Sequence, residues 1–202
     1  MAPDDFRPPA PLGAFAGTAE PERGSIHPYT SDLPDAFFSK LGAVCDEVKC
    51  KPADLLAVMM NESGIRPDAH NPNGDASGLI QFMPHILRGL GYLQGDAAFR
   101  KLSAVDQLPF VARYLRPHMG KLVNATACYL AVFLPTLIGH AAEPNYPLVV
   151  KNGKLGWAYA PNVGFDHDRD GTIRVDELTY ALSRAMLYPR FVEACARANA
   201  AA

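Results

Sequence analysis

The sequence has no long apolar run and almost no excess of charge of one sign. A membrane helix needs roughly 20 consecutive apolar residues, and no stretch comes near that length. The N-terminal segment MAPDDFRPPAPLGAFAG also has neither the basic start nor the apolar centre of a secretory signal. The formal net charge is −2, which argues against bulk attraction to nucleic acid or to an anionic membrane. We therefore expect no nucleic-acid partner and no membrane insertion.

Cysteine is also scarce, with four residues at positions 45, 50, 128 and 195. They show no C-x-x-C spacing and no histidine beside them, which argues against a zinc site. Cys45 and Cys50 could form a disulfide only if the backbone turns between them. Because cysteine often behaves as a small hydrophobic residue, we expect buried free thiols.

Apolar residues at helical spacing are abundant. Of the 202 residues, 49% are hydrophobic and 20% are charged, so one domain can bury a core. No segment shows a convincing strand alternation, and the predicted class is therefore mainly α. Helices are expected from a cap at Ser31 or Asp32, from Pro52, within SAVDQLPFVARYLRPHM, within NATACYLAVFLPTLIGH with an end or kink at Pro135, and from Pro189.

Changes in composition divide the chain into three expected parts. Residues 1–31 contain six of the 18 prolines and three glycines, which predicts an extended arm. Residues 32–145 carry the helical pattern and form the predicted main domain. Residues 146–202 begin with a loop-like stretch and continue into an acidic loop and terminal helices.

A single carboxylate, Glu62, follows the apolar run LLAVMM at the end of the predicted second helix. Partial burial there would raise its pKa, which is what a general acid needs near neutral pH. The polar loop after Gly64 supplies amide and backbone groups of the kind that bind sugars. In the loop's last part, Gly78 permits close backbone approach and Gln81 can both donate and accept hydrogen bonds. A glutamate at a helix end can also be merely solvated, so Glu62 alone would decide nothing.

A second group of acidic residues lies at 166–177, where DHDRDGTIRVDE fits the template of a calcium loop of EF-hand type. Arg174, at the ninth position, cannot coordinate through its side chain. Because carboxylates packed this closely repel one another without a cation, we predict structural Ca²⁺ rather than a solvated turn. The preceding YAPNVGF is a poor helix, so the loop is expected to be a single clamp for the C-terminal helices. The expected ligands are Asp166, Asp168, Asp170, the carbonyl of Thr172, and Glu177.

The string NESGIRPDAHNPNGDASGLIQFMP resembles the signature of the lytic transglycosylases of the lysozyme superfamily. In that family a helix ends in Glu-Ser-Gly, a short loop follows, and Gly-Leu-Met-Gln leads to a proline. The corresponding segments here are 62–64 and 78–81, closed by Pro84. The resemblance is strong over this stretch, and the surrounding helices match only in pattern. It implies a lysozyme-like helical domain that acts on peptidoglycan glycan strands.

The resemblance also implies a role for each matching position. Glu62 would be the single catalytic acid and then the base, cutting the β-1,4 bond between N-acetylmuramic acid and N-acetylglucosamine and closing a 1,6-anhydro ring without water. Ser63 would hold the glutamate or a substrate group. Gln81 and the backbone around Gly78 would bind the sugar beside the cut.

The family's third motif, Ala-Tyr-Asn, is altered in this sequence. Tyr129 within ACYLAVF is the candidate for the tyrosine that hydrogen-bonds the catalytic glutamate, but Leu130 replaces the asparagine. Tyr129 could equally be a core aromatic residue. The altered motif resembles that of phage-encoded members, which implies a virion-associated murein hydrolase. The chain would then be delivered in virions or exported to the cell wall without a classical signal peptide, with the arm contacting other virion or secretion-system proteins.

Two alternatives remain open at the level of sequence. Asp75 could position water as the second carboxylate of an inverting hydrolase, a true lysozyme, although NGDAS is also ordinary turn chemistry. The chain could also be a non-catalytic glycan-binding or structural tail protein that keeps the shape of an enzyme. Some lytic transglycosylases carry a calcium loop of this type, so the two motifs are compatible.

Overall fold

A computed structural model describes residues 30–71 and 75–201, and the described chain is mainly helical, as predicted. The predicted arm therefore lies outside the described residues except for its last two. The α-helices are α1 (Asp35–Val48), α2 (Pro52–Ser63), α3 (Pro84–Gly89), α4 (Asp96–Phe99), α5 (Ala104–Leu115), α6 (Ala125–Phe133), α7 (Val175–Ala185) and α8 (Pro189–Ala200). Short 3₁₀ helices are η2 (Arg116–His118), η3 (Pro135–His140), η4 (Gly156–Ala158) and η5 (Ala160–Phe165), and the strands are β1 (Pro147–Val150) and β2 (Thr172–Arg174).

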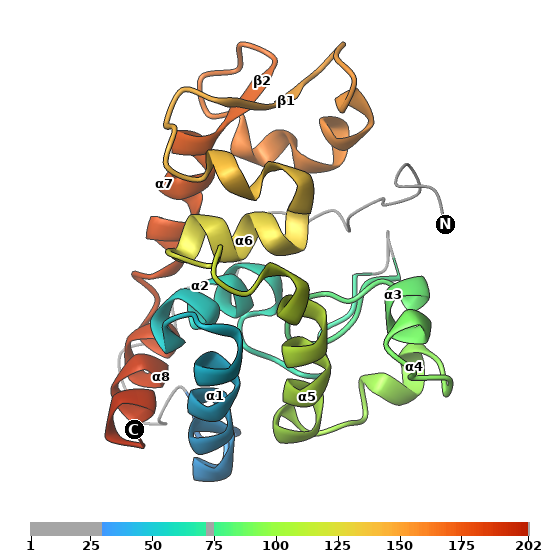
Figure 1. Cartoon of the computed structure of the whole chain (residues 1–202), viewed down its shortest axis with the longest axis vertical. Helices are drawn as coiled ribbons and strands as arrows, with labels where there is room; N and C mark the ends of the chain where they lie inside the picture. Colours follow the sequence, from blue (N-terminus) through green and yellow to red (C-terminus); the bar gives the residue numbers. More distant parts are fainter. Residues whose placement is uncertain (1–29, 72–74, 202) are drawn as a thin grey trace, which may run out of the picture.

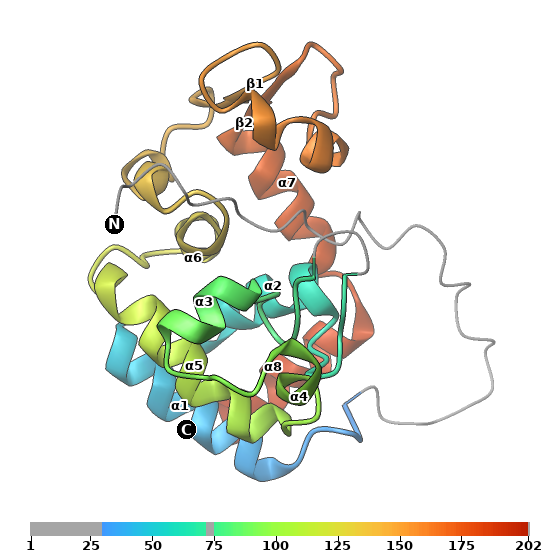
Figure 2. The same ribbon diagram turned by 90° about the vertical axis from the view of Figure 1, so that its right-hand side faces the viewer.

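Helix α6 lies at the centre of the molecule. All nine of its residues are buried, because α2, α7 and η3 pack around it. In Figures 1 and 2 it lies between a lower group of helices, which includes α1 and α5, and an upper segment that carries β1 and β2. A helix that is apolar on every side is stable only with neighbours on every side, so α6 holds the two halves of the core together.

Helix α2 carries the candidate glutamate and has the predicted ends. Pro52 stands in its first turn, and Gly64 caps its C-terminus with φ of 64°. Pro135 follows the end of α6 and starts η3, also as predicted. The expected cap of α1 is wrong, because α1 begins after Pro34 and no side chain caps it in the described structure. Asp32 instead pairs with Arg190 of α8 at 2.7 Å.

The C-terminal segment packs on the predicted main domain. Helix α8 lies against α1 and α2, and Arg197 on α8 donates to the carbonyl of Thr30 at 2.8 Å. The antiparallel pair of β1 and β2 joins Val149 to Ile173, and the sequence analysis did not predict it. The boundary expected between residues 145 and 146 stays a prediction. Among the residues that the structure describes, no helix is long and apolar enough to cross a membrane.

Candidate active site

Glu62 lies in the last turn of α2 and is only 2% exposed. Burial raises the pKa of its carboxyl to about 7, while an interaction with the Tyr129 hydroxyl acts in the opposite direction. Within the described part of the chain, no group hydrogen-bonds its Oε2 atom. A substantial fraction of Glu62 is therefore protonated near neutral pH, as a proton donor requires.

Tyr129 is fully buried on α6, and the structure brings it next to Glu62. Burial and the neighbouring Glu62 carboxylate raise the pKa of Tyr129 well above its ordinary value. Its hydroxyl has no hydrogen bond of acceptable distance and angle among the described residues. The two predicted residues therefore lie close enough to influence each other's pKa, without a direct hydrogen bond.

Tyr114 on α5 is a third polar group near Glu62, and the sequence analysis missed it. Burial, with a smaller contribution from the Glu62 charge, raises its pKa above the ordinary value. Its hydroxyl donates to the carbonyl of Val132 on α6 at 3.5 Å. A tyrosine on an amphipathic helix looks like any core aromatic residue, so the sequence held no signal that could have singled it out.

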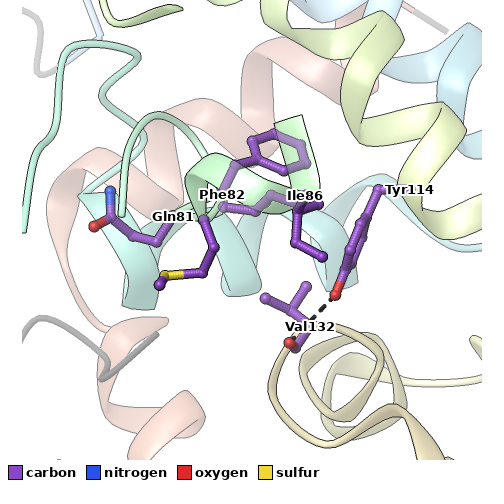
Figure 3. A pocket seen from close by; sticks show the side chains of 7 residues that line it. Gln81, Phe82, Ile86, Tyr114 and Val132 are labelled. Carbon is purple, nitrogen blue, oxygen red and sulfur yellow. Dashed lines mark hydrogen bonds between the residues drawn. The ribbon is translucent and has the colours of Figure 1, made fainter. Parts of the chain in front are cut away.

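A mostly apolar pocket lies between the loop before α3 and helices α5 and α6. Figure 3 shows the Gln81 amide at one side of this pocket and Tyr114, with Val132, at the other. An apolar surface with a few polar groups at its edges is the common form of a small-molecule site. The lining residues are Ile80, Gln81, Phe82, Met83, Ile86, Tyr114 and Val132.

Gln81 places its amide at this pocket through an unusual backbone. Its φ is 52°, and its Nε2 donates to the Gly78 carbonyl at 3.0 Å. The side chain is 1% exposed, and no group in the described residues donates to its Oε1 atom. A buried acceptor without a donor is costly, so Gln81 is suited to receive a hydrogen bond from a bound ligand.

Ser63 contacts three backbone groups around the start of the loop, and its expected role toward Glu62 or a substrate stays a prediction. Its hydroxyl lies 3.0 Å from the Met59 carbonyl and 2.9 Å from the Leu79 carbonyl, and it accepts from the Arg66 amide at 3.2 Å. Because a hydroxyl has one proton and two lone pairs, these backbone groups use its proton and one of its lone pairs. Ser63 therefore fixes the loop to the end of α2.

Gly78 is approached closely by another part of this chain, and the expected role of its backbone in sugar binding stays a prediction. A Cβ atom built there would lie 2.4 Å from Oε1 of Gln107 and 2.8 Å from Cε1 of Phe99. Gln107 on α5 accepts from the Leu79 amide at 3.0 Å and donates to the Pro67 carbonyl at 2.7 Å. Gln107, which sequence reasoning missed, therefore holds both ends of the loop, and Gly78 makes room for it.

Asp75 is exposed and has φ of 54°. Aspartate tolerates this left-handed conformation better than most residues because of its local hydrogen bonding in turns. These features favour the turn interpretation of Asp75 over a role as a second catalytic carboxylate.

The acidic loop brings together three of the five predicted calcium ligands. Carboxylate oxygens of Asp166, Asp168 and Glu177 lie within 4.8 Å of one another. One oxygen of Asp166 accepts from the Gly171 amide at 3.0 Å and from the Tyr159 hydroxyl. The other, Oδ1, is buried, and no described group hydrogen-bonds it. This buried oxygen beside two further carboxylates fits a hard cation such as Ca²⁺.

Asp170 lies outside this cluster of three carboxylates, and its role as a ligand stays a prediction. Its carboxylate forms an ion pair with Arg174 at 2.6 Å, and this guanidinium holds the pKa of Asp170 below its usual range. Arg174, four residues later, thus supplies an opposite charge to Asp170. The role of the Thr172 carbonyl stays a prediction.

Because the pKa of Glu62 is raised, we expect the difference in folding stability between Glu62→Gln and the wild type to depend on pH. Between its ordinary value of 4.5 and about 7, the unfolded chain loses a proton that the folded chain keeps, so folding stability falls as pH rises. Glu62→Gln has no carboxyl at this position, so its folding stability does not fall with pH for this reason. The variant should match the wild type below pH 4.5 and exceed it by up to about 3 kcal/mol above pH 7.

Urea unfolding of both proteins at several pH values would measure this difference. Glu47→Gln is the control, because Glu47 is an exposed glutamate paired with Arg116 on the surface. A difference between Glu62→Gln and wild type that stays constant with pH would contradict the raised pKa.

Comparison with known families finds a match within the predicted main domain. Residues 46–131 match the model of the transglycosylase SLT domain family. The matched range includes Glu62, Gln81 and Tyr129, and the acidic loop lies outside it. The match supports a lytic transglycosylase of the lysozyme-like superfamily in this part of the chain, and thus lytic transglycosylase activity on peptidoglycan in general. Comparisons with curated proteins and with solved structures found no match.

Proposed function

We propose that the chain is a lytic transglycosylase that cleaves the N-acetylmuramic acid–N-acetylglucosamine bond of peptidoglycan with Glu62 as its single acid and base. The observation that carries the proposal is the buried carboxyl of Glu62, with a pKa raised to about 7, inside the range that matches the family. Such a group can donate a proton and then accept one at the same pH.

The reaction then needs no second carboxylate. The Glu62 proton passes to the glycosidic oxygen, the bond from that oxygen to the muramoyl anomeric carbon breaks, and the oxygen leaves with the electron pair. The muramoyl 6-hydroxyl oxygen bonds to the anomeric carbon, and the Glu62 carboxylate takes the hydroxyl proton. Because Glu62 is 2% exposed, glycan binding has to move the side chains that cover it.

The neighbours of Glu62 support this sequence of proton transfers. The Tyr129 hydroxyl favours the charged carboxylate that follows the first transfer. Gln81 lines the pocket beside α6, and its acceptor oxygen, which no described group hydrogen-bonds, can bind a sugar hydroxyl or amide once glycan binding uncovers it. Ser63 and Gln107 act indirectly, because they hold the loop that carries Gln81.

The release of soluble glycan fragments from peptidoglycan distinguishes an enzyme from a non-catalytic glycan-binding module. Purified peptidoglycan incubated with the wild type should yield soluble glycan fragments, whereas a binding module would only sediment with the insoluble material. Binding without any soluble fragment, under conditions in which the chain is folded, would overturn the proposed activity.

We also propose virion-associated action on the cell wall. Its support is the altered third motif, in which the asparagine of the family is replaced by Leu130, a residue fully buried in α6. Detection of the chain in purified virions would support this role, and its confinement to uninfected cells lacking any prophage would overturn it. An arm that contacts other virion or secretion-system proteins is part of the same proposal.

Calcium is the proposed structural ion of the acidic loop, where it would neutralise the charges of Asp166, Asp168 and Glu177. Calcium chloride should raise the melting temperature and chelator should reverse the change. A site filled to about 100 times its dissociation constant contributes about 2.7 kcal/mol. No shift in the wild type with millimolar calcium would contradict the site.

Two variants make the calcium prediction specific. Asp166→Asn should lose the calcium-dependent shift, because it removes charge from the buried oxygens of the cluster. Asp176→Asn makes the same change of charge at an exposed residue whose Oδ1 accepts from the Glu177 amide, a bond that asparagine can keep. This control should retain the shift.

A further inference from the structure

We propose that Phe165 is a positioning residue that couples the acidic loop to Tyr129, so that cation binding in the loop orders the catalytic site. This inference rests on the proposed function. Phe165 immediately precedes Asp166 and is 6% exposed. Its ring centroid lies 5.9 Å from that of Tyr129 at an interplanar angle of 76°, an edge-to-face contact.

The Phe165 ring belongs to an aromatic cluster that includes α6. It lies 6.1 Å from the ring of Phe133, which in turn lies 6.0 Å from Tyr129. All three rings are buried. Since a packed interior has little room for a ring to move alone, a displacement of the backbone at Asp166 has to change the packing around Tyr129.

A second contact ties the loop to the same helix. Thr179, in the helix α7 that leaves the loop, donates to the Val175 carbonyl at 2.8 Å. The Thr179 hydroxyl also lies 2.9 Å from the hydroxyl of Thr126 on α6. Since Thr179 uses its only proton on Val175, Thr126 is the donor in this second bond. Thr126 stands one turn before Tyr129 on α6. The loop therefore contacts α6 on both its entering and its leaving side.

A bound cation would change the balance of charges in the loop, where Arg174 lies 3.9 Å from Asp168 and 2.6 Å from Asp170. Asp166 is held on one side by Tyr159 and Gly171, and it meets Asp168 and Glu177 on the other. Like charges this close repel, and a bound cation draws them together. Because Phe165 is bonded directly to Asp166, we expect the position of its ring to change when a cation binds in the loop. The two sites then share a coupling free energy, which has to be reciprocal.

Reciprocity gives a test that does not depend on activity. Trp157 is the only tryptophan of the chain and stands two residues before Tyr159, so its fluorescence can follow a titration with calcium chloride. Tyr129→Leu should shift the calcium midpoint by about 5-fold or more. In a Phe165→Leu background the same substitution should leave the midpoint unchanged. Additive shifts in this double-mutant cycle, or no calcium response of Trp157, would overturn the coupling.

Cleavage provides a second readout. Calcium should raise kcat of the wild type with little effect on KM, and Phe165→Leu should lose this increase while its Trp157 titration persists. Phe38→Leu is the matched control, because Phe38 is also a buried ring, on α1, that packs on Phe37 and Arg197. If the control loses the calcium effect as well, the Phe165 contact is not the cause. If the wild type fails to cleave peptidoglycan, the proposed function fails, and the fluorescence cycle still decides the coupling.

Discussion

Replacing Glu62 with glutamine is expected to slow glycan cleavage by roughly 10² to 10⁴-fold, the usual contribution of a general acid or base. Glutamine keeps the size of the side chain but neither donates an acidic proton to the leaving oxygen nor accepts one from the muramoyl 6-hydroxyl. The fold should persist, because the variant removes a buried ionisable group and its desolvation cost.

The release of soluble fragments from purified peptidoglycan measures this loss. Glu47→Gln makes the same chemical change on the exposed face of α1, where Glu47 pairs with Arg116, and should cleave at the wild-type rate. A Glu62→Gln protein that is folded and cleaves within about two-fold of the wild type would show that another group supplies the proton, since the expected loss is far larger.

Replacing Gly78 with alanine should destabilise the fold by about 2 to 5 kcal/mol. Part of the cost is the left-handed backbone, with φ of 80°, and part is the clash of the new methyl group with Gln107 and Phe99. The loop held by Gln107 carries Gln81, so the surviving folded fraction should also cleave more slowly.

Gly120→Ala separates the cost of the left-handed backbone from the cost of the steric clash. Gly120 has a nearly identical φ of 83°, and a methyl group there would meet no described atom within 4 Å. This variant should cost only about 1 kcal/mol, the strain of the backbone alone. Urea unfolding compares the two substitutions. An equal loss of stability would mean that the loop moves aside and that Gln107 does not fix it.

The sequence predicted the features of the site that depend on local pattern. The apolar run before Glu62, the proline at the start of α2 and the glycine at its end are local signals, and they placed the carboxyl at the buried end of a helix. The same spacing of acidic residues that predicted the calcium loop brings Asp166 and Asp168 to Glu177, because their separations are fixed within one loop.

The features that the sequence missed depend on contacts between distant residues. Gln107 is 28 residues from Leu79 and 40 from Pro67, and a glutamine on an amphipathic helix normally indicates a solvent-facing position. The contacts of Ser63 with the Leu79 carbonyl and of Gly78 with Gln107 were missed for the same reason, since these partners come from elsewhere in the chain. The strands β1 and β2 are too short, at four and three residues, to show a period of two.

Cleavage in water labelled with heavy oxygen is the most direct test of the central claim that Glu62 closes an anhydro ring without water. Purified peptidoglycan would be digested with the wild type and the fragments weighed by mass spectrometry. The account predicts fragments lighter by one water, ending in 1,6-anhydro-muramic acid, with no heavy oxygen incorporated and none formed by Glu62→Gln. Full-mass reducing ends that carry the heavy oxygen would contradict it and would identify a hydrolase, with Asp75 as the first residue to test.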